Sequence, residues 1–238
     1  MLYLIGLGLN EKSISKQGLE AVKKCKQVYL ENYTIEFPYE IKLLENFLGK
    51  KIIQADREFV ESLQIVDEAS KKDVALLIYG SPLFATTHIS LIQEAKVCGT
   101  KYEIIYNASI FDAISQTGLQ LYKFGKTSSM PAWQKEKNFT PDSFVEIVKE
   151  NLSINAHSLI LVDIGLDFEK AVEQFEISAE KQKLKLGNIL VCSRLGTENP
   201  KIVYAPLEIL RKVRIKNPFC FIVPAKLHFL EKEMLEGF

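Results

Sequence analysis

Short apolar runs alternate with amphipathic stretches along nearly the whole chain. This alternation is typical of β-α units, in which buried strands are joined by helices that cover a largely parallel sheet. In the first half the pattern predicts strands at residues 2–7, 27–30, 51–54, 74–79 and 102–106. It predicts helices at residues 15–25, 39–48 and 57–71. Pro38 is expected in the first turn of the second of these helices, where its missing N–H costs nothing.

The alternation restarts in the second half, after a stretch that is denser in small and polar residues. This stretch, residues 107–125, lies near the middle of the chain and is a natural place for a domain boundary. Beyond it we expect helices at residues 141–152, 168–185 and 226–235, the first capped by Thr140, and strands at residues 158–164, 189–193 and 219–223. The pattern therefore predicts two α/β domains, residues 1–108 and 109–238, with a cleft between them.

Composition narrows the class of protein and its partners. With 238 residues, of which 47% are hydrophobic, the chain can bury a large core. Thirty basic residues balance thirty acidic ones, so no overall field attracts a polyanion, and no direct nucleic-acid partner is expected. Four single cysteines without a C-x-x-C pair are interpreted as reduced core residues, namely Cys25, Cys98, Cys192 and Cys220.

The chain shows no sign of a membrane segment. Its first residues, 1–6, are apolar, but they follow no basic region and run straight into a glycine turn. No run approaches the roughly 20 apolar residues that a membrane span needs. We therefore expect a soluble, cytoplasmic protein without a membrane partner.

The first candidate site is the glycine turn Gly6-Leu7-Gly8-Leu9, which follows a predicted strand and lets the backbone approach a ligand. Glu31 ends the second strand, where a dinucleotide-binding fold keeps its ribose-binding carboxylate. However, Glu11 stands in place of the third glycine of the dinucleotide fingerprint, and its charge would repel a pyrophosphate. Nicotinamide dinucleotide binding is disfavoured, and a plain strand-to-helix turn explains the glycines equally well.

Further candidates follow the later strands, where open α/β sheets place their ligands. They are residues 80–88, 107–113 and 117–125, in which polar residues are bracketed by aromatic ones. Ordinary helix starts remain the alternative, and His88 on its own is interpreted as a hydrogen-bonded surface group. No catalytic triad, phosphate-binding loop, zinc-binding motif or carboxylate pair can be found, so no general base and no metal site is assigned.

Taken together, these blocks resemble the diphthine synthase family in order and spacing. The blocks are residues 3–9, 80–88, 107–110 and 117–126, and residues 141–151, 157–164 and 222–228 extend the resemblance over the whole chain. Each block is weak alone. The combination of Ala85-Thr86-Thr87-His88 with the block from Thr117 to Lys126 is highly specific.

The resemblance implies a tetrapyrrole methylase-like fold, in which two α/β domains enclose a bent S-adenosyl-L-methionine and the protein usually acts as a homodimer. It implies an enzyme that methylates the amino group of the 3-amino-3-carboxypropyl-histidine of elongation factor 2, a step in diphthamide biosynthesis, and releases S-adenosyl-L-homocysteine. Archaeal members of the family are expected to make the trimethylated product, and eukaryotic members add a methyl ester. The compact length favours the archaeal type.

Matching family positions imply a set of cofactor-binding residues: Leu9, Ser81, Phe84, Ser109, Ile110, Val162, Leu195 and Phe219. Two of them depart from the family pattern. Ser81 replaces the usual aspartate, which removes a carboxylate acceptor, and Phe219 stands where a histidine is common. The missing aspartate leaves open a protein that binds adenosylmethionine or the elongation factor without catalysis. Methylation of a tetrapyrrole or of ribosomal RNA ribose is the alternative activity.

Methyl transfer from a sulfonium needs a deprotonated acceptor nitrogen held about 3 Å from the methyl group. Desolvation and the positive sulfonium lower the pKa of an amine, so no dedicated base is required. Repeated methylation ends in a quaternary ammonium, which aromatic faces accommodate. The candidates to supply these faces are Tyr79, Phe84, Tyr106, Phe111 and Tyr122.

Overall fold

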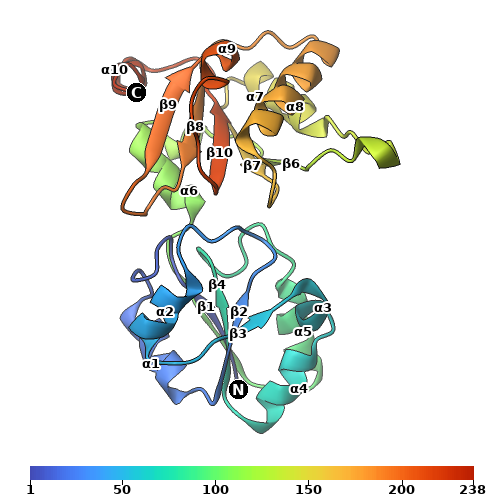
Figure 1. Ribbon diagram of the computed structural model, residues 1–238, viewed down its shortest axis with the longest axis vertical. Helices are drawn as coiled ribbons and strands as arrows, with labels where there is room; N and C mark the ends of the chain where they lie inside the picture. The colour runs from blue at the N-terminus through green and yellow to red at the C-terminus, as the bar shows by residue number, and fades with distance from the viewer. The chain divides into compact units, whose positions relative to one another are not determined.

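The computed structural model describes residues 1–238, which divide into two compact units, Met1–Asp112 (unit 1) and Ala113–Phe238 (unit 2). Each unit contains one five-stranded sheet (Figure 1). The division falls four residues after the predicted boundary at 108/109. These four residues stay with unit 1 because the rings of Phe84 and Phe111 stack, with centroids 5.1 Å apart.

The sheet of unit 1 is entirely parallel, with strand order β3-β2-β4-β1-β5. Its strands are β1 (Leu2–Gly6), β2 (Gln27–Glu31), β3 (Ile53–Ala55), β4 (Val74–Ile78) and β5 (Tyr102–Ile105). All five strands were predicted to within two residues at each end. Parallel pairing brings the carboxyl ends of β4, β1 and β5 side by side at one edge of the sheet.

Helices cover both faces of this sheet (Figure 1). On one face lie α1 (Lys16–Lys24) and α2 (Ile41–Leu48), and on the other lie α3 (Arg57–Glu61), α4 (Gln64–Lys71) and α5 (Ile89–Val97). Successive strand side chains point to opposite faces, so Leu4 packs under α4 and α5 while Ile5 packs under α1 and α2. Both faces are apolar, which explains why these strands read as continuous hydrophobic runs.

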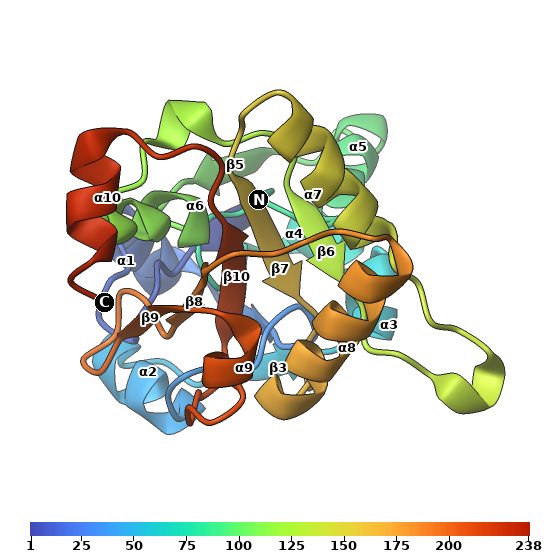
Figure 2. The same ribbon diagram turned by 90° about the horizontal axis from the view of Figure 1, so that it is seen from above.

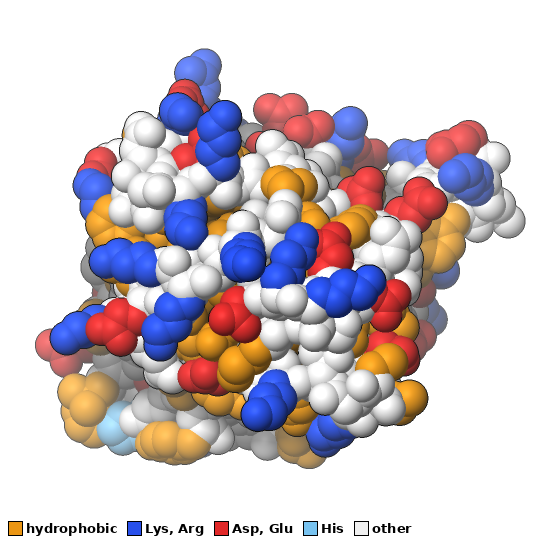
Figure 3. Space-filling model, turned by 90° about the horizontal axis from the view of Figure 1, so that it is seen from below, with side chains coloured by type: hydrophobic (Ala, Val, Ile, Leu, Met, Phe, Trp, Pro, Cys, Tyr) orange, Lys and Arg blue, Asp and Glu red, His pale blue; other side chains and the backbone are white.

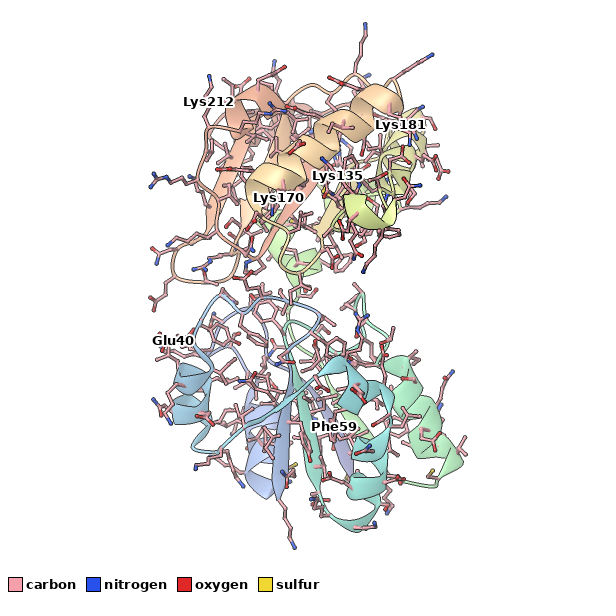
Figure 4. The ribbon with its side chains drawn as sticks, turned by 45° about the vertical axis from the view of Figure 1, so that its right-hand side comes forward. Glu40, Phe59, Lys135, Lys170, Lys181 and Lys212 are labelled. Atoms are coloured by element: carbon pink, nitrogen blue, oxygen red, sulfur yellow. The ribbon has the colours of Figure 1, made fainter.

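Two helix predictions in unit 1 were wrong in detail. Helix α2 begins after Glu40, so Pro38 precedes the helix instead of opening its first turn (Figure 4). The single helix expected over residues 57–71 is two helices, because Leu63 adopts a left-handed conformation with φ 64° and breaks the run. Phe59 of α3 is labelled in Figure 4, and its ring packs on that of Tyr29 with centroids 4.8 Å apart.

The sheet of unit 2 is mixed, with strand order β6-β7-β10-β8-β9. Its strands are β6 (Ser128–Met130), β7 (Ser158–Val162), β8 (Ile189–Ser193), β9 (Lys201–Ala205) and β10 (Phe219–Val223). The central strand β10 runs antiparallel to both neighbours, β8 and β9 are antiparallel, and β6 is parallel to β7. The expectation of a largely parallel sheet is therefore wrong for this half, and its two edge strands were not predicted.

Helix α6 (Ile110–Ala113) lies at the division between the units, and the α-helices of unit 2 are α7 (Ser143–Ser153), α8 (Phe168–Lys181), α9 (Leu207–Leu210) and α10 (Phe229–Leu235). Helices α7 and α8 lie side by side against one face of the sheet (Figure 2). Phe175 of α8 contacts both Phe144 and Phe221 at the centre of this core, with ring centroids 5.6 and 5.5 Å apart. Helix α7 begins after Asp142, so Thr140 is not its cap.

The surface mixes charges of both signs. On the face seen in Figure 3, basic and acidic side chains are interspersed, in keeping with the balanced composition. Around α8, Lys135, Lys170 and Lys181 each lie within 4 Å of a carboxylate (Figure 4). No helix of the chain combines the length and apolar character needed to cross a membrane.

The cysteines are free thiols, and three of them are buried as predicted, namely Cys25, Cys192 and Cys220. Cys98 is exposed, which corrects the prediction that all four lie in the core. It follows the last turn of α5, where its thiol donates to the carboxylate of Glu94 at 3.0 Å.

A buried charge ties the C-terminal helix of unit 2 to two other segments. Glu231 of α10 has no exposed surface and accepts hydrogen bonds from Lys123 Nζ at 2.5 Å and His157 Nε2 at 3.1 Å. The backbone amides of Gln120 and His228 add bonds of 3.1 and 2.7 Å. Burial raises the pKa of Glu231, but these donors outweigh it and lower the pKa to about 2. The carboxylate is therefore charged and fully satisfied at neutral pH.

We predict that Glu231→Ala lowers the free energy of unfolding by about 3–5 kcal/mol, because it leaves the buried His157 and two backbone amides without their acceptor and the half-buried Lys123 without its counter-charge. Urea unfolding of the purified protein measures this loss. Glu236→Ala, at the residue that follows the same helix, is the matched control, since the side chain of Glu236 forms only an exposed ion pair with Lys232 at 3.9 Å, which contributes less than about 1 kcal/mol. Equal losses in the two variants would contradict the role given to Glu231.

Candidate functional site

Two glycine turns are joined at the carboxyl edge of the unit 1 sheet. Gly8, after β1, and Gly80, after β4, exchange backbone hydrogen bonds of 3.1 and 2.9 Å. Both have positive φ, 72° and 74°, a conformation that favours glycine. The first turn is also closed on itself, because Ser13 Oγ donates to the carbonyl of Leu7 at 2.8 Å.

Asn107, directly after β5, joins the third turn to this pair. Its Nδ2 donates to the carbonyls of Gly6 and Ser13, at 3.0 and 2.9 Å, and its Oδ1 accepts from the amide of Ala108 at 2.8 Å. A Cβ added to Gly6 would lie 2.7 Å from the carbonyl oxygen of Gly80, so the turns touch through their backbones. The three turns, residues 6–10, 80–88 and 107–111, thus form one hydrogen-bonded edge, which we call the turn platform.

Five of the eight predicted cofactor-binding residues lie on the turn platform: Leu9, Ser81, Phe84, Ser109 and Ile110. The carbonyl of Leu9 accepts a hydrogen bond from the Tyr79 hydroxyl at 2.8 Å, which holds this residue in place. Ser81 and Ser109 are buried, whereas Phe84 is 55% exposed. The platform therefore offers hydroxyl groups, backbone groups and apolar side chains within one unit of the fold.

The predicted surface position of His88 is wrong, because the side chain has no exposed surface. Its Nδ1 lies 2.9 Å from Thr86 Oγ1 and its Nε2 lies 3.3 Å from the hydroxyl of Tyr33. Burial lowers the pKa of His88 to about 4, so the ring is neutral at pH 7. Since both nitrogens are engaged, His88 supports the loop between β4 and α5 and is not placed to act as a base.

Glu31 is also buried, and it is turned into its own loop. Its carboxylate accepts hydrogen bonds from the amides of Tyr33 and Thr34, at 3.1 and 2.7 Å, and from the hydroxyl of Thr34 at 2.8 Å. Burial raises the pKa of Glu31, while these bonds oppose the rise. The residue fixes the turn after β2, which in turn places Tyr33 beside His88.

Sequence reasoning missed the connecting roles of Tyr33 and Ser13. Neither has a spacing that marks it, because each acts on a segment that is brought close only by folding. Asn107 carried the one available signal, a polar residue directly after a buried strand. A position of that kind suits a side chain that bonds to neighbouring backbone, since the ends of parallel strands leave backbone groups without ladder partners.

The other three predicted residues lie together at one edge of the unit 2 sheet. Val162 ends β7, Leu195 follows β8, and Phe219 begins β10. Because β10 is antiparallel to both neighbours, these ends coincide, as the pairing of Phe219 with Ser193 shows. Leu195 and Phe219 are buried. The ring of Phe219 packs against those of Phe168 and Phe221, with centroids 5.3 and 5.6 Å apart. A phenylalanine at this position, where the family often has a histidine, therefore becomes part of the apolar core.

No group of three or more histidine, cysteine, aspartate or glutamate side chains is placed to hold a metal ion. The described site residues are instead apolar or carry neutral polar groups.

Comparison with known proteins shows the family of the chain. Residues 1–210 match the family model of the tetrapyrrole (corrin/porphyrin) methylases. The chain is 48% identical to a diphthine methyl ester synthase of Schizosaccharomyces pombe, over the whole chain and 94% of that protein. It is 37% identical to a diphthine synthase of Methanocaldococcus jannaschii, over 99% of the chain and 98% of that protein. The chain belongs to the diphthine synthase family.

Solved structures confirm the fold of this family member. A putative diphthine synthase from Entamoeba histolytica superimposes with a TM-score of 0.90 at 35% identity, covering the whole chain and 98% of that structure. The sequence-based expectation of a two-domain tetrapyrrole methylase-like fold is thereby confirmed. The chain is a methyltransferase of diphthamide biosynthesis, as the resemblance implied.

Gly8 tests the geometry of the turn platform. A Cβ added there would lie 2.4 Å from Ser13 Oγ, and the backbone φ of 72° adds strain. We predict that Gly8→Ala lowers the free energy of unfolding by roughly 2–4 kcal/mol, measured by urea unfolding. Gly49→Ala is the control, because Gly49 has φ 63° but open space around it, and about 1 kcal/mol is expected. Losses of the same size would show that crowding at the platform contributes nothing.

The burial of His88 predicts a pH dependence of stability. Its pKa is lower in the folded chain, at about 4, than the ordinary 6.5, so the folded state binds fewer protons and its stability falls as pH drops below 6.5. Between pH 7 and pH 5 this residue should account for roughly 2 kcal/mol of lost stability. Urea unfolding across this range should show a shallower dependence for His88→Asn. Tyr33→Phe should keep the pH dependence of stability of the unsubstituted protein, because the imidazole ring of His88 stays buried.

Proposed function

We propose that this enzyme transfers methyl groups from S-adenosyl-L-methionine to the 3-amino-3-carboxypropyl-histidine of elongation factor 2 in the cytoplasm. The observation that carries the proposal is the turn platform, on which five implied cofactor-binding residues lie together. The similarity to diphthine synthases over the whole chain supports the choice of acceptor.

The residues of the turn platform fit the donor in their chemistry. None of the residues 6–10, 80–88 and 107–111 is an aspartate, glutamate, lysine or arginine. Neutral hydroxyl and backbone groups suit the uncharged adenosine part of the donor. They suit a phosphate group less well, because phosphate favours cationic partners. Leu9, Ser81, Phe84, Ser109 and Ile110 would hold the donor in unit 1, and the corresponding residues of unit 2 are Val162, Leu195 and Phe219.

S-adenosylmethionine supplies an electrophilic methyl group when bound. The chain's own contribution is to position the acceptor and to exclude water, because effective transfer depends on alignment of the reacting atoms. Apolar side chains such as Leu9 and Ile110 desolvate the acceptor amine and so lower its pKa, which frees the lone pair at neutral pH. The amine releases its proton to bulk solvent before it is enclosed, and the singly and doubly methylated ammonium groups must each do the same before the next transfer, so no side chain of the platform needs to accept it.

The number of methyl groups that this enzyme adds is inferred from the names of its relatives, with more weight given to the relative of higher identity. The Schizosaccharomyces pombe relative, at 48% identity, is named a methyl ester synthase, whereas the Methanocaldococcus jannaschii relative, at 37%, is named a diphthine synthase. We therefore propose that the enzyme methylates the amine fully and then the carboxylate of the acceptor. The compact length of the chain, which favoured the archaeal product, weighs less than this similarity.

A homodimer is part of the proposal. Helix α10 exposes three large apolar side chains, Phe229, Leu230 and Met234. Phenylalanine and methionine are enriched in the cores of protein interfaces, so this helix is a suitable contact for a second copy. The family resemblance supports the same assembly.

The test uses elongation factor 2 isolated from cells that lack this methyltransferase, incubated with the enzyme and labelled S-adenosylmethionine. Intact mass should rise by one methyl group at a time, and mild alkali should remove only the last group, because an ester hydrolyses and a quaternary ammonium does not. Cofactor binding without any gain in mass would contradict the proposal and would leave a binding protein. Labelling of ribosomal RNA or a tetrapyrrole in place of the factor would assign the alternative activities.

A further inference from the structure

An exposed aromatic pair stands on the turn platform. The rings of Phe84 and Phe111 stack with an interplanar angle of 29° and centroids 5.1 Å apart. Phe84 is 55% exposed, so the face of its ring that does not contact Phe111 is open. Burying a large apolar side chain stabilises the folded protein. An aromatic side chain left exposed at a candidate ligand-binding edge is therefore a candidate contact for a ligand.

The backbone around Phe84 is strained. Leu83 has φ 102° and Ala85 has φ 51°, and neither residue is glycine. Conformations of this kind persist only where the surroundings impose them, and they concentrate at binding and catalytic sites. Here the hydrogen-bonded His88 fixes the far end of the loop and the Gly80 bridge fixes its start. The strained loop holds Phe84 against Phe111.

The electrostatic surroundings of the pair favour a cation. Residues 80–88 and 106–113 contain no lysine or arginine. The one charged side chain among them is that of Asp112, which follows Phe111 in the sequence. Its Oδ2 accepts a hydrogen bond from the amide of Ser109 at 2.7 Å. A carboxylate one residue from Phe111 in the sequence gives this edge a negative charge, and the ring quadrupole adds its own attraction for a cation.

The other aromatic candidates fit less well. The Tyr79 hydroxyl donates to Leu9, and its ring packs on Phe37 with centroids 5.5 Å apart, so this side chain is structural. Tyr106 is 64% exposed but has no stacked aromatic partner. Tyr122 lies in unit 2 and bonds to Gln120 at 2.6 Å.

The acceptor of the proposed reaction changes its chemistry as it is methylated. A fully methylated nitrogen is a permanent cation without any N–H group, so it cannot be held by hydrogen bonds and is recognised by aromatic faces. We propose that the pair Phe84 and Phe111 binds this quaternary ammonium and so holds the acceptor while its carboxylate oxygen takes the last methyl group. This inference rests on the proposed function and assigns a specificity-determining pair within it.

The experiment compares Phe84→Leu and Phe111→Leu, which keep an apolar side chain but remove the aromatic face. Phe84→Tyr restores an aromatic face at the same position. Phe139→Leu is the matched control, since Phe139 is an exposed phenylalanine of unit 2 outside the site. Each protein is checked for a thermal transition like that of the unsubstituted enzyme. Intact mass of elongation factor 2 over time gives the rates of amine and ester methylation, and calorimetry gives the Kd for S-adenosylhomocysteine.

Both leucine variants, assayed at saturating S-adenosylmethionine, should slow ester formation by roughly fivefold relative to amine methylation and accumulate the trimethylated product. Because Phe84 is also one of the implied donor-binding residues, the test is the ratio of the two methylation rates within each variant, and the Kd for S-adenosylhomocysteine shows how far donor binding changes as well. Phe84→Tyr should recover most of the ester rate, and Phe139→Leu should match the unsubstituted enzyme. An unchanged ratio of ester to amine methylation would overturn the inference, whether or not the Kd rises. If the Kd rises with that ratio unchanged, the pair serves the donor. Absence of any methylation by the unsubstituted enzyme would contradict the proposed function itself, before any variant is compared.

Discussion

The exchange of backbone hydrogen bonds between Gly8 and Gly80 is the interaction on which the turn platform, the candidate site of unit 1, depends. It joins two turns that are 72 residues apart in the sequence, and Asn107 adds the third turn through the carbonyls of Gly6 and Ser13. Both residues have positive φ, which favours glycine, and an added Cβ at Gly8 would also collide with Ser13. The parallel sheet supplies the other condition, because it places the ends of β4, β1 and β5 side by side.

In unit 2, segments distant in the sequence are joined by a buried charge instead of by backbone hydrogen bonds between glycine turns. Glu231 is a buried carboxylate whose donors come from three separate segments of the unit. His157 completes the network as a neutral ring, since its Nδ1 accepts from the amide of Ala225 at 2.9 Å while its Nε2 donates to Glu231. Such a network is costly to break and leaves few alternative arrangements. It holds the segment around Lys123, which carries one of the most specific family blocks.

Much of unit 1 could be predicted from the sequence because its three inner strands, β2, β4 and β1, are buried on both faces and read as apolar runs. Unit 2 was harder for a physical reason. A strand such as β9 lies at the edge of the sheet and is only partly buried, so its pattern is weak, and periodicity carries no information on strand direction. The break at Leu63 likewise depends on a left-handed residue that propensity does not mark.

The family resemblance implied eight cofactor-binding positions, and the structure places five of them together in unit 1. Their supports could not be predicted. The burial of His88 depends on Tyr33, from a turn 55 residues earlier, so neighbouring residues in the sequence suggested an exposed side chain. The position of Asn107 gave a signal, but its partners Gly6 and Ser13 became evident only in the folded chain.

The central claim is that the turn platform forms the donor site of the methyltransferase. Hydrogen–deuterium exchange of the enzyme with and without S-adenosylhomocysteine tests it directly. The account predicts added protection of backbone amides in residues 6–10, 80–88 and 107–111 when the compound is bound. Saturating binding that leaves the exchange of all three segments unchanged would contradict the claim.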